Sequence, residues 1–428
     1  MKRFWTWILI AALLSGCAAA PQNQQTNPEE TLPTVPETVE PTVEPMVLET
    51  VPPIETEPEP LAQQITGMHK VILSGTNWTT YLADSNHYTK RSVKTGDLLT
   101  VESAQAFSSV YITWDTLPGE YTLSWDGGSM TCGGENFFHD YIRLPETVEL
   151  LKFEFAEGAE PVVCDILIFT EGTAPEGIQD WQEPCERADV LVFPTHSDDD
   201  ALFFGALMSY YAIERELTVQ TAFMVEHYWY PERNHERLNG LWEMGLRHYP
   251  ILYNAPDTMT HDMGEALDFY SKSNICQWQV EQIRRFKPLV VVGHDLEGEY
   301  GNGGHKVNAY YLVQAVELAA HSEYYPESAQ QYGVWDSPKL YLHLYEENRM
   351  TLDVNTPMEK DALGRTPFQV AEDAYKWHVS QHGLSYKVRQ DENYPDHDCR
   401  FFGLYRSLVG ADTVADIMEN IDAADWRK

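Results

Sequence analysis

Short apolar runs alternate with longer amphipathic stretches through the carboxyl-terminal half of the chain. The apolar runs span residues 189–194, 217–225, 248–253, 288–293 and 338–344. The stretches with helical periodicity span residues 200–214, 232–247, 274–286, 305–322 and 366–381. Strands that alternate with helices favour a mostly parallel sheet covered by helices on both faces. We therefore expect an α/β domain with a Rossmann-like sheet over residues 188–428, and a site at the carboxyl ends of its strands.

The residues in front of this domain follow the two-residue period of half-buried strands. Val110, Ile112 and Trp114 alternate with Tyr111 and Thr113. Several short strands separated by turn residues predict an all-β sandwich over residues 65–170, followed by a linker over 171–187. In outline this segment resembles the jelly-roll modules of extracellular carbohydrate-active enzymes. The aromatic residues that either stack on sugars or pack within the module are Trp78, Tyr81, Tyr88, Phe137 and Phe138.

The amino terminus has the layout of a lipoprotein signal. Lys2 and Arg3 precede an apolar run that is shorter than the roughly 20 residues needed to span a bilayer. Residues 14–17, Leu-Ser-Gly-Cys, resemble the lipobox of bacterial lipoproteins, so residues 1–16 are expected to be a signal peptide and Cys17 to carry the lipid. An ordinary secretory signal is the alternative. Residues 17–64 are rich in Pro, Glu and Thr and predict a disordered tether, so we expect an extracytoplasmic protein that is lipid-anchored to the bacterial cell membrane.

The net charge of −37 limits the choice of partners. A surface this acidic repels phosphate backbones, so nucleic acid is not expected as a partner. It also disfavours binding to anionic lipids or wall polymers by charge alone, and an uncharged or weakly charged substrate fits best. The cysteines lack Cys-x-x-Cys spacing and so do not predict a cysteine zinc site. Cys132 and Cys164 lie in the same predicted module and are either a disulfide or buried thiols.

A histidine and several carboxylates follow directly on the first apolar run. Residues 194–200 read Pro-Thr-His-Ser-Asp-Asp-Asp. At a strand end, His196 and Asp199 can face one divalent ion, zinc above all, with iron or manganese bound less selectively. Asp198 can then take a proton from a water that the ion activates. His305 is the natural third ligand, and three ligands with an open position describe a hydrolytic site. The alternative is that these aspartates only cap the next helix.

With these two segments the chain resembles the LmbE-like or PIG-L-type metal-dependent N-deacetylases, which remove acetyl groups from N-acetylglucosamine-type amino sugars. The family motif His-Pro-Asp-Asp-Glu corresponds to residues 196–200, His-Ser-Asp-Asp-Asp. The later motif, roughly Gly-Glu-Tyr-Gly-His-Pro-x-His, corresponds to residues 298–305, Gly-Glu-Tyr-Gly-Asn-Gly-Gly-His. Further correspondences are Arg233, Glu236, Met244-Gly245 and the His-x-Ser-Gln of residues 378–381.

The resemblance implies roles for the matching residues. His196, Asp199 and His305 would be metal ligands, Asp198 the general base, and Arg233 would lie near the sugar hydroxyls. Apart from the resemblance, the loop aromatics Trp229 and Tyr230 can stack on a sugar ring, and Tyr300 can supply a hydroxyl. Residues that either serve the site or only pack and cap are His294, Asp295, His378 and Gln381.

The chain departs from the family motif at three positions, and one of them affects the proton donor of the reaction. Ser197 and Asp200 replace Pro and Glu without removing a ligand. Asn302 replaces a histidine that stabilises the oxyanion or protonates the leaving amine. An asparagine donates a hydrogen bond to an oxyanion but transfers no proton. Either activity is reduced or the acid comes from another residue, for which the candidates are Asp198, His227, His261 and His294.

The expected function is that of a zinc-dependent hydrolase that removes acetyl groups from N-acetylated amino sugars at the cell surface, with Fe²⁺ as an alternative metal. Hydrolysis of another amide or ester by the same chemistry is the closest alternative. A glycan-binding surface lipoprotein that keeps the metal but is inactive or weakly active is the alternative from a different class, and the change at Asn302 is what favours it.

Overall fold

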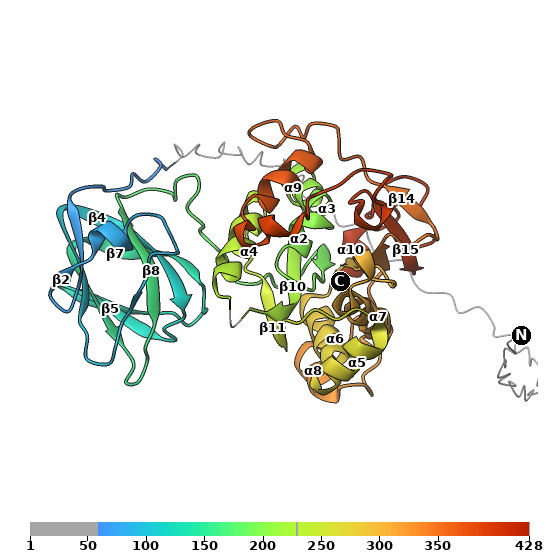
Figure 1. Cartoon of the computed structure of the whole chain (residues 1–428), viewed down its shortest axis with the longest axis horizontal. Helices are drawn as coiled ribbons and strands as arrows, with labels where there is room; N and C mark the ends of the chain where they lie inside the picture. The colour runs from blue at the N-terminus through green and yellow to red at the C-terminus, as the bar shows by residue number, and fades with distance from the viewer. Residues whose placement is uncertain (1–58, 228–229, 428) are drawn as a thin grey trace, which may run out of the picture. The chain divides into compact units, whose positions relative to one another are not determined.

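Two β-sheets organise the part of the chain that the structure describes, residues 59–227 and 230–427 (Figure 1). The structure is a computed structural model. The strands of the first sheet lie between His69 and Phe169, and those of the second between Val190 and Ser407. Two sheets with interspersed helices confirm the mixed α/β class. The predicted signal peptide, Cys17 and nearly all of the predicted tether lie outside the described residues.

The first sheet is antiparallel and is built around two long strands, β4 (Leu99–Thr116) and β7 (His139–Phe155). Its described strands pair in the order β2-β1-β4-β7-β5-β6, and β8 pairs with β4 and β3. The other elements of this region are β1 (His69–Leu73), β2 (Thr76–Asn77), α1 (Thr79–Leu82), β3 (Arg91–Ser92), β5 (Tyr121–Trp125), β6 (Gly128–Cys132) and β8 (Val162–Phe169). The strands hydrogen-bond as one continuous sheet, so the two packed layers of a sandwich stay a prediction.

Burial on β4 differs from the half-buried pattern that its sequence predicts. Ile112 belongs to the main core, as expected. Tyr111, expected on the outer face, is also buried, because it packs against Tyr141 and Leu167 in a second small cluster. Both faces of this strand are therefore covered.

Aromatic residues considered for sugar stacking divide into two groups. Phe137 and Phe138 are buried and pack in the core, so the packing alternative holds for these two. Tyr81 and Tyr88 are exposed, and the Arg91 guanidinium lies 4.0 Å above the ring of Trp78. Sugar stacking therefore stays a prediction for the exposed Tyr81 and Tyr88 and for the half-buried Trp78.

The second sheet is parallel over most of its width. Its strands run in the order β11-β10-β9-β12-β13-β15-β14, and the ladders from β11 to β13 are parallel whereas those of β15 are antiparallel. The strands are β9 (Val190–Val192), β10 (Val219–Glu226), β11 (Ile251–Pro256), β12 (Val290–Gly293), β13 (Lys339–His343), β14 (Arg349–Thr351) and β15 (Phe401–Ser407). Each predicted apolar run of this half overlaps one of the parallel strands. The strands β9, β10, β12 and β13 are buried almost throughout, which is typical of a sheet covered on both faces, whereas the edge strand β11 is only partly buried.

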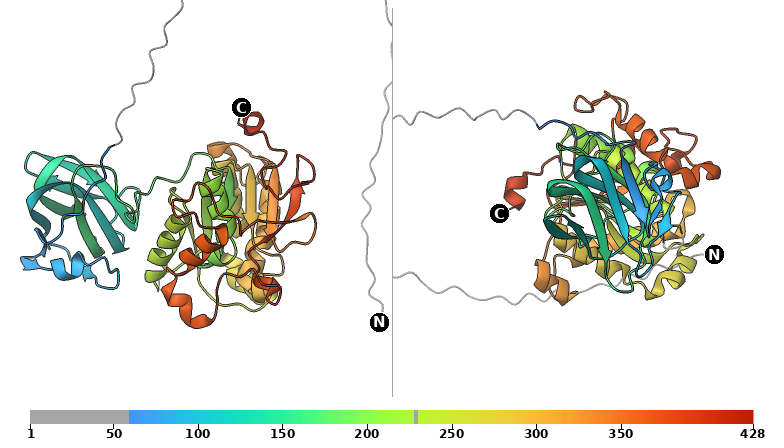
Figure 2. Two further views of the ribbon diagram at one scale, coloured as in Figure 1. Left: turned by 90° about the horizontal axis from the view of Figure 1, so that it is seen from above. Right: turned by 90° about the vertical axis from the view of Figure 1, so that its left-hand side faces the viewer.

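Helices pack against both faces of this sheet (Figures 1 and 2). Along β9, Val190 and Val192 face one layer, whereas Leu191 and the following Phe193 face the other. The first layer contains α2 (Asp199–Leu202), α3 (Gly205–Ser209), the π-helix Tyr210–Glu214, α4 (Glu232–Glu243) and α9 (Pro367–Tyr375). The second contains α5 (Met263–Phe269), α6 (Ile275–Phe286), α7 (Gly303–Leu318) and α8 (Pro326–Tyr332). Short elements are the 3-10 turns Tyr270–Lys272, Glu299–Gly301, Val379–Leu384 and Pro395–His397, and α10 (Ala423–Trp426).

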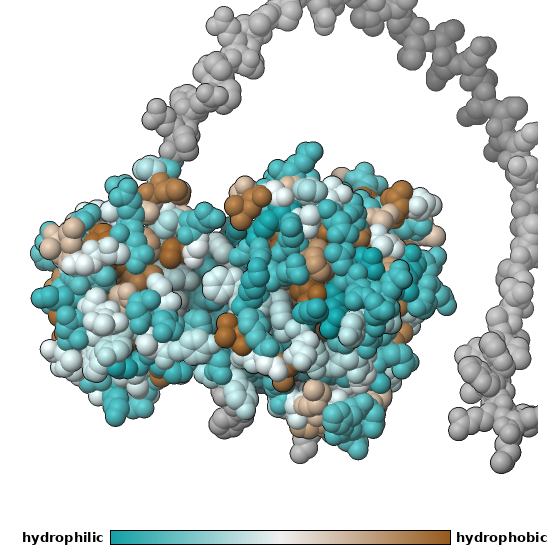
Figure 3. Space-filling view, turned by 45° about the horizontal axis from the view of Figure 1, so that its top comes forward, coloured by the Kyte–Doolittle hydropathy of each residue, from teal (hydrophilic) through white to brown (hydrophobic). Residues whose placement is uncertain are grey.

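Three further features of the described residues concern their surface, their helices and their cysteines. Exposed apolar side chains are scattered among hydrophilic ones on the face shown in Figure 3. Within residues 59–227 and 230–427, no helix has the length and apolar character needed to cross a membrane. Cys132 and Cys164 are both buried free thiols, so the disulfide alternative is wrong for this pair.

Candidate metal centre

The parallel strands of the second sheet deliver titratable side chains at their carboxyl ends. These ends meet at one edge of the sheet, which is where sites form in such folds. The residues at or just after the strand ends are His196, Asp198 and Asp199 after β9, His227 after β10, Asp257 after β11, His294 after β12 and His343 at the end of β13.

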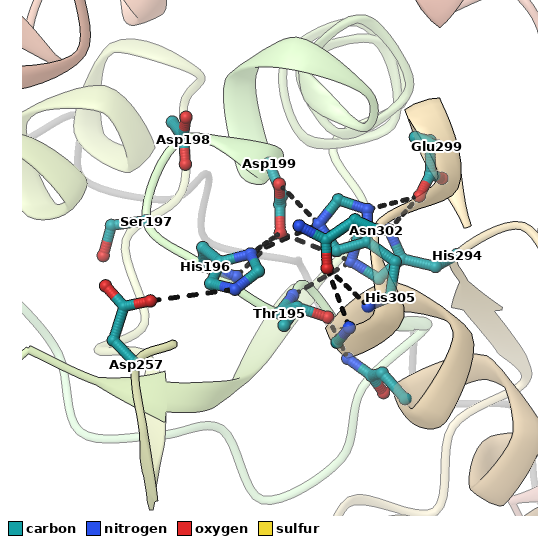
Figure 4. A network of polar contacts seen from close by, with 12 residues as sticks. Thr195, His196, Ser197, Asp198, Asp199, Asp257, His294, Glu299, Asn302 and His305 are labelled. Carbon is teal, nitrogen blue, oxygen red and sulfur yellow. Dashed lines mark hydrogen bonds and ion pairs between the residues drawn. The ribbon is translucent and has the colours of Figure 1, made fainter. Parts of the chain in front are cut away.

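His196, Asp199 and His305 bring one ligand atom each to a common point (Figure 4). His196 Nδ1 lies 3.2 Å from His305 Nε2 and 3.3 Å from Asp199 Oδ2, and His305 Nε2 lies 3.2 Å from Asp199 Oδ1. Ligand atoms of a tetrahedral zinc ion, bound at about 2.0–2.1 Å, lie about 3.3 Å apart. The spacing of this triangle therefore fits a zinc-sized ion, and imidazole with carboxylate is a donor set that suits zinc or iron.

Local hydrogen bonds hold the members of the triangle in place. Asp199 opens α2, and its Oδ2 accepts a hydrogen bond of 2.7 Å from the backbone N–H of His196. His305 lies in the first turn of α7. Burial alone would raise the pKa of Asp199, but His305 and His196 outweigh it and hold this pKa well below its usual range. Asp199 is therefore ionised, as a metal ligand must be.

Asp198 lies beside the triangle in an unusual backbone conformation. Its φ of 140° falls in the region that residues with a side chain rarely adopt, and such strain is typical of functional sites. The Asp198 N–H donates a hydrogen bond of 2.8 Å to Asp200 Oδ1, which stabilises the turn. Burial raises the pKa of Asp198 to about 6, although the neighbouring Arg233 opposes the shift. A carboxylate with this pKa suits proton transfer near neutral pH.

Arg233 makes its hydrogen bonds within the protein. Its guanidinium donates to Asp198 Oδ1 at 3.0 Å, to the Ser197 carbonyl oxygen at 2.5 Å and to Asp257 Oδ2 at 3.0 Å. These contacts assign Arg233 to holding Asp198, while its expected place near sugar hydroxyls stays a prediction.

Asp257 is a member of the site that the sequence did not reveal. Its Oδ2 accepts a hydrogen bond of 3.0 Å from His227 Nδ1, and its Oδ1 lies 3.9 Å from His196 Nε2. Burial lowers the pKa of His227 to about 3, so its ring is neutral and its Nε2 accepts from the Ser197 N–H at 3.2 Å. The only sequence signal for Asp257 is its position shortly after a predicted apolar run.

Asn302 has a structural role besides any catalytic one. It is the N-cap of α7, and its Oδ1 accepts hydrogen bonds from the backbone N–H groups of Gly304 and His305 at 2.8 and 3.2 Å. Its Nδ2 lies 3.4 Å from Tyr300 Oη and 3.8 Å from Met259 Sδ. The amide oxygen is therefore used by the helix, whereas Nδ2 donates over long distances to Tyr300 and Met259, contacts that a substrate oxygen can replace.

The remaining candidates lie at different depths. Tyr300 adopts a left-handed φ of 46°, and its ring centre lies 5.3 Å from those of Tyr386 and His397. His294 is fully buried, with Nε2 3.5 Å from Asp199 Oδ2, which places it behind the triangle. His378 is buried, with its Nε2 3.6 Å from Asp200 Oδ2. Asp295 and Gln381 are half-buried, and Tyr230 and His261 are exposed. Trp229 lies outside the described residues.

A comparison of sequences finds a partial likeness to a deacetylase. No protein-family model matches the chain. A 1D-myo-inositol 2-acetamido-2-deoxy-alpha-D-glucopyranoside deacetylase from Saccharopolyspora erythraea is 30% identical over 117 residues, which cover 26% of this chain and 42% of the relative. The chain thus matches less than half the length of this relative, and the likeness to a deacetylase is one of sequence over that segment.

Solved structures give weaker likenesses. A conserved protein from Thermus thermophilus is similar with a TM-score of 0.34 and 17% identity, over 46% of this chain and 81% of that one. An N,N'-diacetylchitobiose deacetylase from Pyrococcus horikoshii is similar with a TM-score of 0.31 and 14% identity, over 47% of this chain and 74% of that one. These scores are too low to support a conclusion about function.

Replacing His305 should abolish tight metal binding. We expect His305→Ala to bind zinc more than about 100-fold more weakly, since losing a ligand costs more than the 10- to 100-fold penalty for losing a residue that only orients one. Competition with a chromogenic chelator measures the affinity. The exposed His321 provides the matched control, His321→Ala. Full zinc binding by His305→Ala would show that the third ligand is another residue.

Proposed function

We propose that this chain is a zinc-dependent hydrolase of the LmbE-like or PIG-L type that removes acetyl groups from N-acetylated amino sugars. The observation that carries the proposal is the triangle of His196, Asp199 and His305, with donor atoms 3.2–3.3 Å apart and Asp198 beside it. The sequence likeness to a deacetylase of an acetamido sugar supports the choice of substrate class. The acidic surface agrees with a substrate that carries little negative charge.

The residues around the triangle divide the reaction between them. A divalent ion held by the triangle would polarise the amide carbonyl and lower the pKa of a water next to it. Asp198 accepts the proton of the water that attacks the carbonyl carbon, and Arg233 holds the Asp198 carboxylate in place. Asn302 Nδ2 and the Tyr300 hydroxyl are the donors available to the oxyanion.

The second half of the reaction requires a proton for the leaving amine. Asn302 cannot supply it, whereas Asp198 carries the proton that it has just accepted. Its raised pKa allows it to hold this proton and then release it to the nitrogen as the C–N bond breaks. Acetate and a free amine leave, and Asp198 returns to its ionised form. Asp198 thus serves as base and then as acid.

Replacing Asp198 should separate catalysis from metal binding. We expect Asp198→Asn to keep zinc and to release acetate about 10²- to 10⁴-fold more slowly from N-acetylglucosamine oligomers, because the variant lacks the proton acceptor. Acetate release and zinc content are measured on the same preparations. The exposed Asp268 gives the control Asp268→Asn. Turnover that is unchanged in Asp198→Asn would contradict the mechanism, and a wild-type protein that binds the sugar without releasing acetate would favour the glycan-binding alternative.

Two substitutions at Asn302 should separate its cap from its donor. Asn302→Asp keeps an oxygen for the N-cap of α7 but loses the Nδ2 donor, so we expect near-normal thermal stability and a rate about 10²- to 10³-fold lower. Asn302→Ala loses both, and its stability should fall by about 1 kcal/mol in addition. Thermal unfolding and acetate release are measured side by side. A normal rate in Asn302→Asp would rule out the donor role.

The proposal also covers the fold type and the location of the protein. We propose that the second sheet is Rossmann-like, that the first sheet forms a β-sandwich, and that the protein is exported and carries a lipid on Cys17. If Cys17 is the lipid site, the wild-type protein should incorporate labelled fatty acid and partition into detergent, and Cys17→Ser should do neither. A wild-type protein without label that is found free in the medium would instead support an ordinary secretory signal.

A further inference from the structure

A fully buried carboxylate, Glu299, binds three histidines at the carboxyl edge of the second sheet. Its Oε2 accepts hydrogen bonds from His305 Nδ1 and His294 Nδ1, each at 2.8 Å, and its Oε1 accepts one from His343 Nδ1 at 2.7 Å. Figure 4 shows Glu299 on the far side of His305 and His294 from His196. We infer that Glu299 is a positioning residue that fixes which ring nitrogen His305 turns toward the metal. This inference rests on the proposed function only in taking the triangle as a metal site.

A tight loop brings Glu299 to this position. β12 ends at Gly293, and the chain then turns back within a few residues into the 3-10 turn Glu299–Gly301. Gly298 has a φ of 66°, and a Cβ there would lie 2.4 Å from the Asn302 carbonyl oxygen, so the loop closes only with glycine. Glu299 Oε1 also accepts from the Asp295 N–H at 3.2 Å. The turn at Gly298 and the hydrogen bond from Asp295 thus fix the position of the Glu299 carboxylate within the loop.

The bond to Glu299 determines the tautomer of His305. A carboxylate accepts hydrogen bonds, so Nδ1 of His305 carries the proton that it shares with Glu299. Nε2, which faces Asp199 and His196, is then the nitrogen whose lone pair is free for an ion. A histidine ligand whose other nitrogen donates to a carboxylate is both oriented and made more basic.

His294 repeats this arrangement on the backbone side of the triangle. Its Nδ1 donates to Glu299, and its Nε2 accepts a hydrogen bond of 3.0 Å from the Thr195 N–H. Thr195 precedes the ligand His196 directly. Glu299 therefore also stabilises, through His294, the backbone from which His196 projects.

His343 is the third histidine ring in contact with Glu299. Its Nδ1 lies 2.7 Å from Glu299 Oε1, and its Nε2 lies 2.9 Å from the Asp398 carbonyl oxygen. Burial alone would raise the pKa of Glu299, but the histidines outweigh it and hold this pKa well below its usual range. His343 thus contacts the Oε1 side of the carboxylate, while Oε2 faces His305 and His294.

Glu299→Gln tests this role because it keeps the size of the side chain. An amide has one acceptor oxygen and one NH₂ group, so it cannot accept from all three rings. We expect zinc affinity about 10- to 100-fold weaker than in the wild type, measured by chelator competition on the full chain. The control is Glu297→Gln, two residues away and exposed, which should bind zinc normally. Equal zinc affinity in Glu299→Gln and the control would overturn the inference.

Nitrogen NMR of histidine-labelled, zinc-loaded wild type tests it without a variant, and so covers the case in which Glu299→Gln does not fold. We expect His305 to show a solvent-protected Nδ1–H and a zinc-ligated Nε2. Ligation through Nδ1 would overturn the inference. Neither readout depends on acetate release, so a protein that binds zinc but does not deacetylate would refute the proposed function and leave the role of Glu299 standing.

Discussion

Buried charges at the carboxyl edge of the second sheet require partners, because an isolated charge away from water is costly. Glu299 is surrounded by the rings of His343 and two further histidines, and Asp198 accepts a hydrogen bond from Arg233, which also donates to Asp257. Each of these pairs joins segments that leave different strands. The pairing therefore fixes how the strand ends stand relative to one another, and the fold of this half and its site depend on the same contacts.

The triangle of His196, Asp199 and His305 differs from these pairs because its three members leave room for an ion or a proton between them. His196 and His305 face each other across 3.2 Å with Asp199 as their common carboxylate. Without an ion, burial opposes a proton on His305, but Asp199 and Glu299 outweigh burial and raise the pKa of His305 to about 10. A proton there occupies the place that a metal would take. Metal and proton thus compete for the same nitrogen, as expected when ligands must be deprotonated to bind.

Much of the second sheet could be predicted from the sequence because its strands are buried on both faces. Apolar runs such as residues 288–293 need no partner to be recognised, and β12 lies within that run. The triangle could be predicted because His196 and Asp199 are three residues apart and His305 belongs to a second recognisable motif. The antiparallel strands β14 and β15 were missed, since β14 is only three residues long and neither follows the strand–helix alternation.

The supporting residues could not be predicted, because their partners come from distant segments. His343 is 44 residues from Glu299, and Asp257 is 24 residues from Arg233. No local period or motif marks such pairs, and topology alone brings them together. The cap formed by Asn302 was hidden for a different reason: its place in a catalytic motif suggested chemistry, whereas its amide oxygen begins a helix.

The side chains around the site differ in their exposure to solvent, so among these residues solvent can reach the site from one side only. The side chain of Asp257 is 28% exposed and that of Asp198 10%, whereas those of Asp199, His305 and Glu299 are at most 2% exposed. Solvent therefore reaches the centre from the side of Asp198 and Asp257. Protons can exchange with bulk water on that side, whereas the hydrogen bonds between Glu299 and its histidines are shielded from it.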